Sequence, residues 1–342
     1  MQFVILTRRD PKTDFRRALA RALREEGYNC YVVLVRRKLV VDGPRENDAT
    51  LHLSPIKFVR FLRKLILADD TIVVDSLNLG DPLFCLLLRA LLWRSVWAYD
   101  IHDYLLYDLQ GFKRFVGRAS LKIHLLISNF SFHASPTLLE LYPKSVRLGN
   151  ASHLMRRKKK LDNLNQVLVL ASIDERFDFE LVRRILAENK VELHVFGSLA
   201  EGSTTNTQLL VRTTFESLCS EFPNFTYFGA YDNQAIESIL DNYQIMLAPY
   251  KSDHFSTRYI EPLRYYHALN RGLEIISTPI PALRDLAEFI HVIRSPDDFS
   301  TVLGDLSKSP DSWKNDRKQF KAVTWNVRAK SLVALAENYI VS

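Results

Sequence analysis

An acidic and aromatic segment, YDIHDYLLYD, directly follows a strand-like apolar run. Its first half contains Asp100, His102 and Asp103, and a carboxylate or an imidazole can take the proton of a hydroxyl group in general-base catalysis. A base of this kind must point into a ligand site from the end of a strand. A purely structural role, in which all three side chains cap the next segment, stays open.

A basic, hydroxyl-rich loop follows the apolar run IMLAP. Residues 250–261 supply Lys251 and Arg258, and Pro262 suits the first turn of a helix that carries Arg264. The N-terminus of a helix offers unsatisfied N–H groups and a partial positive charge, which favour phosphate. The start of this helix is therefore a candidate phosphate site, and Arg264 lies near it, with an ordinary salt bridge as the alternative role of this side chain.

Short apolar runs alternate with helical patterns over most of the 342 residues. Such alternation predicts an α/β fold with mainly parallel sheets covered on both faces. Strands are expected at residues 3–6, 30–35, 71–75, 96–100, 125–128, 146–148, 167–171, 192–196, 226–228, 245–248 and 274–277. Helices are expected at residues 15–26 and 82–92, with Asp14 and Asp81 at their N-cap positions, and at residues 179–188 and 233–240.

The alternation breaks at the basic stretch NASHLMRRKKKLDNLNQ and then restarts. We therefore expect two Rossmann-like doubly wound domains facing across a cleft, at residues 1–155 and 164–310. A helical tail at residues 311–342 is expected to cross back to the first domain. Ligands of such sheets bind at the carboxyl ends of the strands, so the site should lie in the cleft.

Several classes of protein are disfavoured by what the sequence lacks. The first turn, TRRDPKTDF, contains no glycine, which argues against a nicotinamide or flavin enzyme, and no GxxxxGK[ST] loop occurs. The three cysteines match no metal spacing and are odd in number, which argues against a disulfide framework and indicates a reducing compartment. No DxD-type motif stands in a convincing position, so we expect no metal requirement. The basic run at residues 156–160 lacks interleaved aromatic residues, so nucleic acid is not an expected partner.

The formal net charge is +7, and part of it lies on a helix expected at residues 54–67. Lys57, Arg60 and Lys64 fall on one face of that helix. This face is either a solvated surface or a contact with anionic lipid. The N-terminus lacks the features of a signal peptide, and we expect a cytoplasmic protein with peripheral contact at the inner face of a membrane.

The second half resembles the donor-binding domain of GT-B glycosyltransferases. The resemblance lies in the order of VFGS, YFGAYDN, IMLAPYKSDHFSTRYIEPLRYYHALNRGLEIIST and SPDDF, and it covers most of residues 165–300. It implies a nucleotide-sugar donor, expected to be UDP-linked, as co-substrate and no separate cofactor. The residues that it places at the donor are Arg264, Arg258, Lys251, Tyr250 and Gly197.

Two features near the donor site depart from the usual family pattern or stay ambiguous. His267 stands where these enzymes commonly have a glutamate for the ribose hydroxyls, and Glu261 is the nearest carboxylate that could replace it. The segment ASIDERFDFELV is similar to the first donor-domain loop of some relatives, in which Arg176 would reach a phosphate. Arg176 could instead pair with Asp174 while Asp178 caps the next helix.

The opening segment also resembles the corresponding loop of the xanthan glucuronosyltransferase and its relatives, bacterial exopolysaccharide glycosyltransferases. In that loop the catalytic aspartate stands four positions after a tyrosine, which selects Asp103 after Tyr99 as the base, ahead of Asp100 and His102. The resemblance implies an inverting, metal-independent transfer of a sugar to a glycan or lipid-linked acceptor in bacterial polysaccharide or glycoconjugate synthesis. A retaining transferase and a noncatalytic sugar-nucleotide-binding or scaffold subunit of the same fold are the alternatives.

Overall fold

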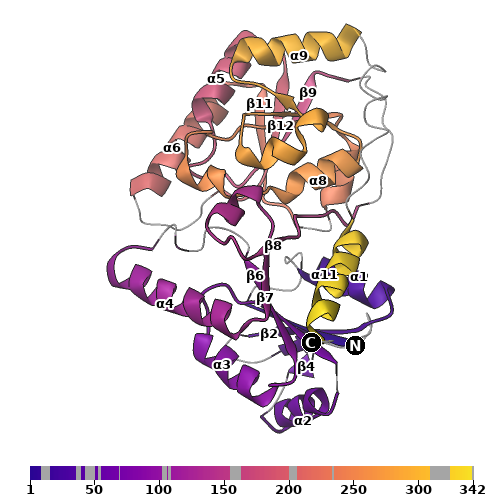
Figure 1. The fold of residues 1–342 in the computed structure, drawn as a ribbon. Helices are drawn as coiled ribbons and strands as arrows, with labels where there is room; N and C mark the ends of the chain where they lie inside the picture. Colours follow the sequence, from indigo (N-terminus) through magenta and orange to yellow (C-terminus); the bar gives the residue numbers. More distant parts are fainter. Residues whose placement is uncertain are drawn as a thin grey trace. The chain divides into compact units, whose positions relative to one another are not determined.

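The computed structural model divides the chain into two compact units, Met1–Gly149 with Thr324–Ser342, and Asn150–Val323 (Figure 1). The second unit therefore begins before the boundary expected at residue 155. Helix α11 (Trp325–Ile340) belongs to the first unit, where it packs on α1 and β6. The structure describes residues 1–8, 16–35, 40–42, 51–52, 55–68, 70–101, 106, 109–154, 163–199, 206–232, 235–308 and 324–340.

The first unit contains an eight-stranded sheet in the order β4-β3-β2-β1-β5-β6-β7-β8. Six strands are parallel, and β3 and β4 add an antiparallel pair at the β2 edge. The sequence analysis did not predict this pair. The strands are β1 (Gln2–Thr7), β2 (Asn29–Leu34), β3 (Val40–Asp42), β4 (Leu51–His52), β5 (Thr71–Ser76), β6 (Val96–Ile101), β7 (Phe130–His133) and β8 (Val146–Arg147).

Helices cover both faces of this sheet, and its central strands are therefore buried on both sides. Helix α1 (Arg16–Glu25) packs on β1 and β2, and α11 packs beside it. On the opposite face, Val4 and Leu6 of β1 share a core with α2 (Pro55–Ile66), α3 (Pro82–Leu91) and α4 (Gly111–Ile127).

Two local predictions for the first unit were wrong. The strand expected at residues 125–128 is the C-terminal end of α4, and the strand itself is Phe130–His133. Asp81 stands at the N-cap position of α3 but makes no side-chain cap hydrogen bond. Its Oδ2 instead accepts a 2.8 Å hydrogen bond from Arg8 Nε and lies 2.7 Å from Arg8 Nη2 in an ion pair. Asp14 lies outside the described residues.

The second unit contains a fully parallel six-stranded sheet in the order β11-β10-β9-β12-β13-β14. Its strands are β9 (Gln166–Leu170), β10 (Glu192–Phe196), β11 (Phe225–Gly229), β12 (Ile245–Ala248), β13 (Glu274–Ser277) and β14 (His291–Val292). Its helices are α5 (Phe179–Glu188), α6 (Asn206–Glu221), α7 (Ile236–Asp241), α8 (Leu263–Asn270) and α9 (Pro296–Lys308).

Alternate residues of β9 divide the second unit into two cores. Leu168 and Leu170 pack with α7 and α8, whereas Val167 and Val169 pack with α5, α6 and α9. The chain leaves β9 toward β10 on one side, and β12 lies on the other side. The carboxyl ends of β9 and β12 are therefore the topological switch point, where ligands of open α/β sheets bind.

Candidate functional site

A small pocket lies at the switch point of the second unit, at the carboxyl ends of β9 and β12. It is lined by Ala171, Ser172, Phe177, Ala248, Pro249, Tyr250 and Arg264. The wall is mainly apolar, and the Arg264 guanidinium is its cationic group. A pocket of this composition suits an anionic group held against a flat apolar surface.

Arg264 is fixed within this pocket by two contacts. It is the second residue of α8, behind Pro262 at the N-cap position. Its Nη1 donates a hydrogen bond to the Leu170 carbonyl at the end of β9, and its guanidinium carbon lies 5.5 Å from the centroid of the Tyr250 ring. Within the described part of the chain, no carboxylate pairs with Arg264. The guanidinium therefore keeps N–H donors for an oxyanion ligand, in the fork geometry that suits phosphate.

Tyr250 forms a rigid wall of the pocket. Its side chain is buried, its backbone N–H donates to Thr278 Oγ1 at 2.8 Å, and burial raises the pKa of its phenol. The Arg264 and Arg176 guanidinium groups lower that pKa in part, which places both cations near the ring. The phenol stays neutral at ordinary pH and can donate a hydrogen bond.

Arg176 lies on the loop after β9 and is committed to a local pair. Its Nε lies 3.0 and 3.1 Å from the two carboxylate oxygens of Asp174, and its Nη2 also contacts that carboxylate. Asp178 caps α5 by accepting a 3.0 Å hydrogen bond from Leu181 N–H. The local pairing that the sequence analysis left open is the arrangement in the structure.

Backbone hydrogen bonds tie this loop to the one that follows β12. Lys251 N–H donates to the Arg176 carbonyl at 2.7 Å, and Asp178 N–H donates to the Pro249 carbonyl at 2.9 Å. The Lys251 side chain is half-buried. Arg258 is exposed and lies 5.7 Å from the centroid of the Tyr259 ring. The structure brings Arg264, Tyr250 and Arg176 together, and the tied loops hold them in place.

Gly197 follows β10 and allows a close approach of two strand ends. Its φ is 153°, and a Cβ at this position would lie 1.5 Å from the Ala171 carbonyl oxygen. Its N–H donates to the Gly229 carbonyl at 2.9 Å. No other residue fits here without moving the end of β9, which lines the pocket.

Two residues that were predicted to bind the sugar-nucleotide donor are buried and make hydrogen bonds to other residues of the second unit. Glu261 is 5% exposed, and its Oε2 and Oε1 accept from Asn150 N–H at 2.5 Å and from Tyr266 O–H at 2.9 Å. His267 is 5% exposed, and its Nδ1 lies 2.8 Å from Ser152 Oγ. Burial, followed by the charge of His153, lowers the pKa of His267 to about 3, so the imidazole is neutral. Both residues anchor the segment that opens the second unit.

Asp100, one of the candidate bases, is buried at the end of β6 in the first unit. Its Oδ2 accepts a 2.6 Å hydrogen bond from Ser76 Oγ and lies 3.7 Å from Arg16 Nε. Arg16 is 1% exposed. These contacts hold the Asp100 carboxylate inside the first unit, which is a structural role. Asp103 and His102 lie outside the described residues.

A buried polar cluster of Asp75, Cys85 and His124 escaped the sequence analysis. The candidate ligand atoms of these three side chains lie within 4.8 Å of one another. Among the described residues, this is the group whose spacing would allow a metal ion to bind. Asp75 Oδ2 lies 2.5 Å from His124 Nδ1, and its Oδ1 accepts from Leu77 N–H at 3.1 Å. Burial and the Asp75 carboxylate raise the pKa of the Cys85 thiol, so the thiol is protonated in the metal-free protein. The cluster is a hydrogen-bonded part of the core.

Solved structures share the fold of the whole chain, although no family model and no curated protein matches the sequence. HepE from Anabaena in complex with UDP superposes with a TM-score of 0.69 and 10% identity, covering 99% of this chain and 100% of that one. Sucrose-phosphate synthase from Thermosynechococcus elongatus gives 0.64 and 13% identity, with full coverage of both chains. An alpha-glucosyltransferase in complex with UDP gives 0.66 and 11% identity, covering 98% and 100%.

These neighbours define the fold class of the chain. They are GT-B glycosyltransferases, and the two Rossmann-like units described above give this chain the same α/β architecture. At 10–13% identity the likeness concerns the fold. The chemistry of the site depends on the residues of this chain.

Proposed function

We propose that this protein is a glycosyltransferase that binds a nucleotide-sugar donor, UDP-linked, in the switch-point pocket of its second unit. The observation that carries the proposal is the Arg264 guanidinium, which enters that pocket without a carboxylate partner among the described residues. The structural neighbours HepE and the alpha-glucosyltransferase were solved with UDP bound, which supports the choice of nucleotide.

The proposed chemistry is an inverting transfer without a metal ion. A hydroxyl oxygen of a glycan or lipid-linked acceptor attacks the anomeric carbon, the bond to the diphosphate oxygen breaks, and a base takes the hydroxyl proton. Arg264 stabilises the charge that develops on the leaving diphosphate, the role that a divalent cation has in other transferases. We retain Asp103 as the base, because Asp100 is held by Arg16 and Ser76. We propose a role in bacterial polysaccharide or glycoconjugate synthesis, at the inner face of a membrane.

The ribose contact differs in this proposal from the usual carboxylate clamp. His267 and Glu261 are both buried against residues 150–154 and Tyr266. In this proposal the Tyr250 ring and the backbone groups of the loop after β9 position the nucleoside. A ribose held by fewer groups would bind more weakly than in enzymes with a free glutamate.

A titration with UDP in the absence of metal tests the donor site. Isothermal calorimetry should detect UDP binding to the wild-type protein. Arg264→Gln should weaken it by roughly 10- to 100-fold, because a hydrogen bond to a charged group contributes about 1.5–3 kcal/mol. Arg184→Gln is the matched control, because Arg184 is an exposed arginine on α5 that pairs with Glu188. Equal UDP affinity in the wild type and in Arg264→Gln would reject the assignment.

A noncatalytic sugar-nucleotide-binding subunit is the second candidate. The observation that favours it is the burial of both potential ribose ligands, His267 and Glu261. Release of UDP from UDP-sugars in the presence of a panel of glycan and lipid-linked acceptors separates the two functions. UDP binding without turnover for any acceptor would favour the binding subunit. Anomeric analysis of a product would separate inverting from retaining transfer.

A further inference from the structure

Helix α3 of the first unit is apolar on its outer as well as its inner face. Cys85, Leu88 and Leu92 face the core, but the solvent side presents four more leucines. Leu83, Leu86, Leu87 and Leu91 are 76%, 39%, 59% and 40% exposed, at the i, i+3, i+4, i+8 spacing of one helix face. A helix that is apolar all round is normally buried on all sides.

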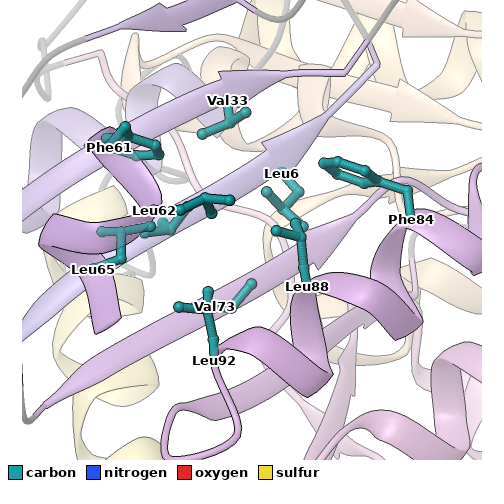
Figure 2. A pocket seen from close by; sticks show the side chains of 10 residues that line it. Leu6, Val33, Phe61, Leu62, Leu65, Val73, Phe84, Leu88 and Leu92 are labelled. Atoms are coloured by element: carbon teal, nitrogen blue, oxygen red, sulfur yellow. The ribbon is translucent and has the colours of Figure 1, made fainter. Parts of the chain in front are cut away.

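The neighbouring helices extend this apolar surface. Figure 2 shows side chains on the inner sides of α2 and α3, such as Leu62 and Leu88, reaching toward Leu6 and Val73 of the sheet, so both helices belong to one layer. Ile123 and Ile127 of α4 join the same core. The outer residues of this layer, including the turn after α3, are Val59, Ile66, Leu67, Leu83, Leu86, Leu87, Leu91, Trp93, Phe112, Phe115, Val116 and Leu126, all of them exposed. We call this surface the α2–α4 face.

The α2–α4 face also contains the protein's excess positive charge. The three helices hold nine of the 46 Lys and Arg residues and none of the 39 Asp and Glu residues. Without these nine residues the formal charge of the chain would be −2 instead of +7. The exposed basic side chains include Arg60, Arg63, Lys113, Arg114, Arg118 and Lys122.

Charge determines which partner fits this surface. A second copy of the chain would bring two helix layers of nine positive charges together, which like-charge repulsion opposes. Leucine, phenylalanine and tryptophan interleaved with lysine and arginine, without acids, are the composition of surfaces that lie in the headgroup region of an anionic bilayer. We propose that the α2–α4 face docks on the surface of an anionic lipid bilayer.

The docked protein lies on the bilayer and does not cross it. Within the described ranges, no helix is both long enough and apolar enough to span a membrane. The leucines of α3 and the phenylalanines of α4 enter the headgroup region, and the basic side chains contact lipid phosphates. On α2, Lys64 Nζ donates a 2.9 Å hydrogen bond to the Tyr31 hydroxyl, while Arg60 and Arg63 are exposed. Helices α3 and α4 are the principal contact.

Vesicle co-sedimentation of the full chain tests this proposal. The vesicles are pure phosphatidylcholine or a mixture of phosphatidylcholine and phosphatidylglycerol. Wild-type protein should bind the mixed vesicles and much less the neutral ones, and added salt should weaken the binding. The double variant Arg118→Gln/Lys122→Gln should partition roughly 30-fold less, since each basic residue near an anionic surface contributes about one factor of five. Its matched control is Arg184→Gln/Arg212→Gln on α5 and α6.

A second pair of variants tests the apolar part of the face. Leu83→Ser/Leu87→Ser should lower vesicle binding by roughly tenfold or more, because both leucines are exposed in solution and leave water only on docking. Leu209→Ser/Leu210→Ser on α6, where the leucines are 63% and 67% exposed, is the matched control and should bind as the wild type does. Circular dichroism checks that all variants are folded.

Three results would overturn the proposal. They are absence of binding to the mixed vesicles, equal binding by the α3 or α4 variants and their controls, and a wild-type dimer that Leu83→Ser/Leu87→Ser converts to a monomer. UDP titration in vesicle-free solution provides an independent readout. The membrane variants should keep wild-type UDP affinity, so failure of membrane docking and failure of the donor site are distinguishable.

Discussion

Acid should destabilise the second unit through His267. The side chain is 5% exposed, and its pKa is lowered to about 3 by burial and by the charge of His153. In the unfolded chain a histidine titrates near 6.5. Because the folded pKa lies below the unfolded one, the stabilisation is present above pH 6.5 and is lost as the pH falls from 6.5 toward 3.

The size of this effect follows from proton linkage. At pH 5.5, one unit below the unfolded pKa, protonation of His267 in the unfolded state should cost about 1.4 kcal/mol of the free energy of unfolding. His133 in the first unit acts in the same direction, because burial and Arg147 lower its pKa to about 4. The window for His133 therefore runs from pH 6.5 to about pH 4.

Urea unfolding at pH 7.5 and pH 5.5, followed by far-ultraviolet circular dichroism, measures this loss. His267→Gln removes the titrating group while keeping a polar side chain that can contact Ser152. Its loss of stability between the two pH values should be smaller than that of the wild type by about 1.4 kcal/mol. Ser152→Ala, which keeps the buried imidazole, should retain the wild-type pH dependence. An identical pH dependence in the wild type and His267→Gln would refute the reasoning.

Two further comparisons use matched variants. Gly197→Ala should destabilise the second unit by about 3 kcal/mol or more, since its Cβ would lie 1.5 Å from a carbonyl oxygen, whereas Gly304→Ala has open space and should stabilise α9 by roughly 0.5–1 kcal/mol. Urea unfolding of both variants decides the point, and similar effects would contradict the close approach at Gly197. Asp100→Asn should destabilise the first unit by about 1–3 kcal/mol, because it weakens the buried contacts of this side chain with Ser76 Oγ and Arg16. Asp103→Asn should instead lower kcat by roughly 10²- to 10⁴-fold with UDP affinity retained. Steady-state kinetics measures kcat and thermal melts measure the stability of both variants. A wild-type kcat in Asp103→Asn would show that Asp103 is not the base.

The sequence by itself determined most of the elements and their order. Strands β10, β12 and β13 and helix α5 begin and end where the pattern predicted them. The spacing of apolar residues and the position of turn residues are local properties of the sequence. A strand that is buried on both faces can therefore be predicted from its own residues. The order of those elements was enough to predict two doubly wound units.

The local sequence pattern gave a wrong prediction where the same residues suit both a strand and a helix. The run LLIS at residues 125–128 was predicted as a strand, yet it ends α4, because Leu121, His124 and Ile127 form one buried helix face. A short apolar run cannot separate these cases by periodicity alone. The Asp81 side chain does not cap α3 for a different reason. Its carboxylate instead accepts a hydrogen bond from Arg8, which is 73 positions away in the sequence.

The roles of the charged residues were decided by the tertiary structure. The sequence left both Arg264 and Arg176 as candidates for a phosphate contact. In the structure Asp174 pairs with Arg176, while α8 presents Arg264 to the pocket. Glu261 appeared available for a ribose until the fold placed Asn150 and Tyr266 against it. Whether a charge is free to bind a ligand depends on partners brought from distant parts of the chain, and only the folded structure specifies them.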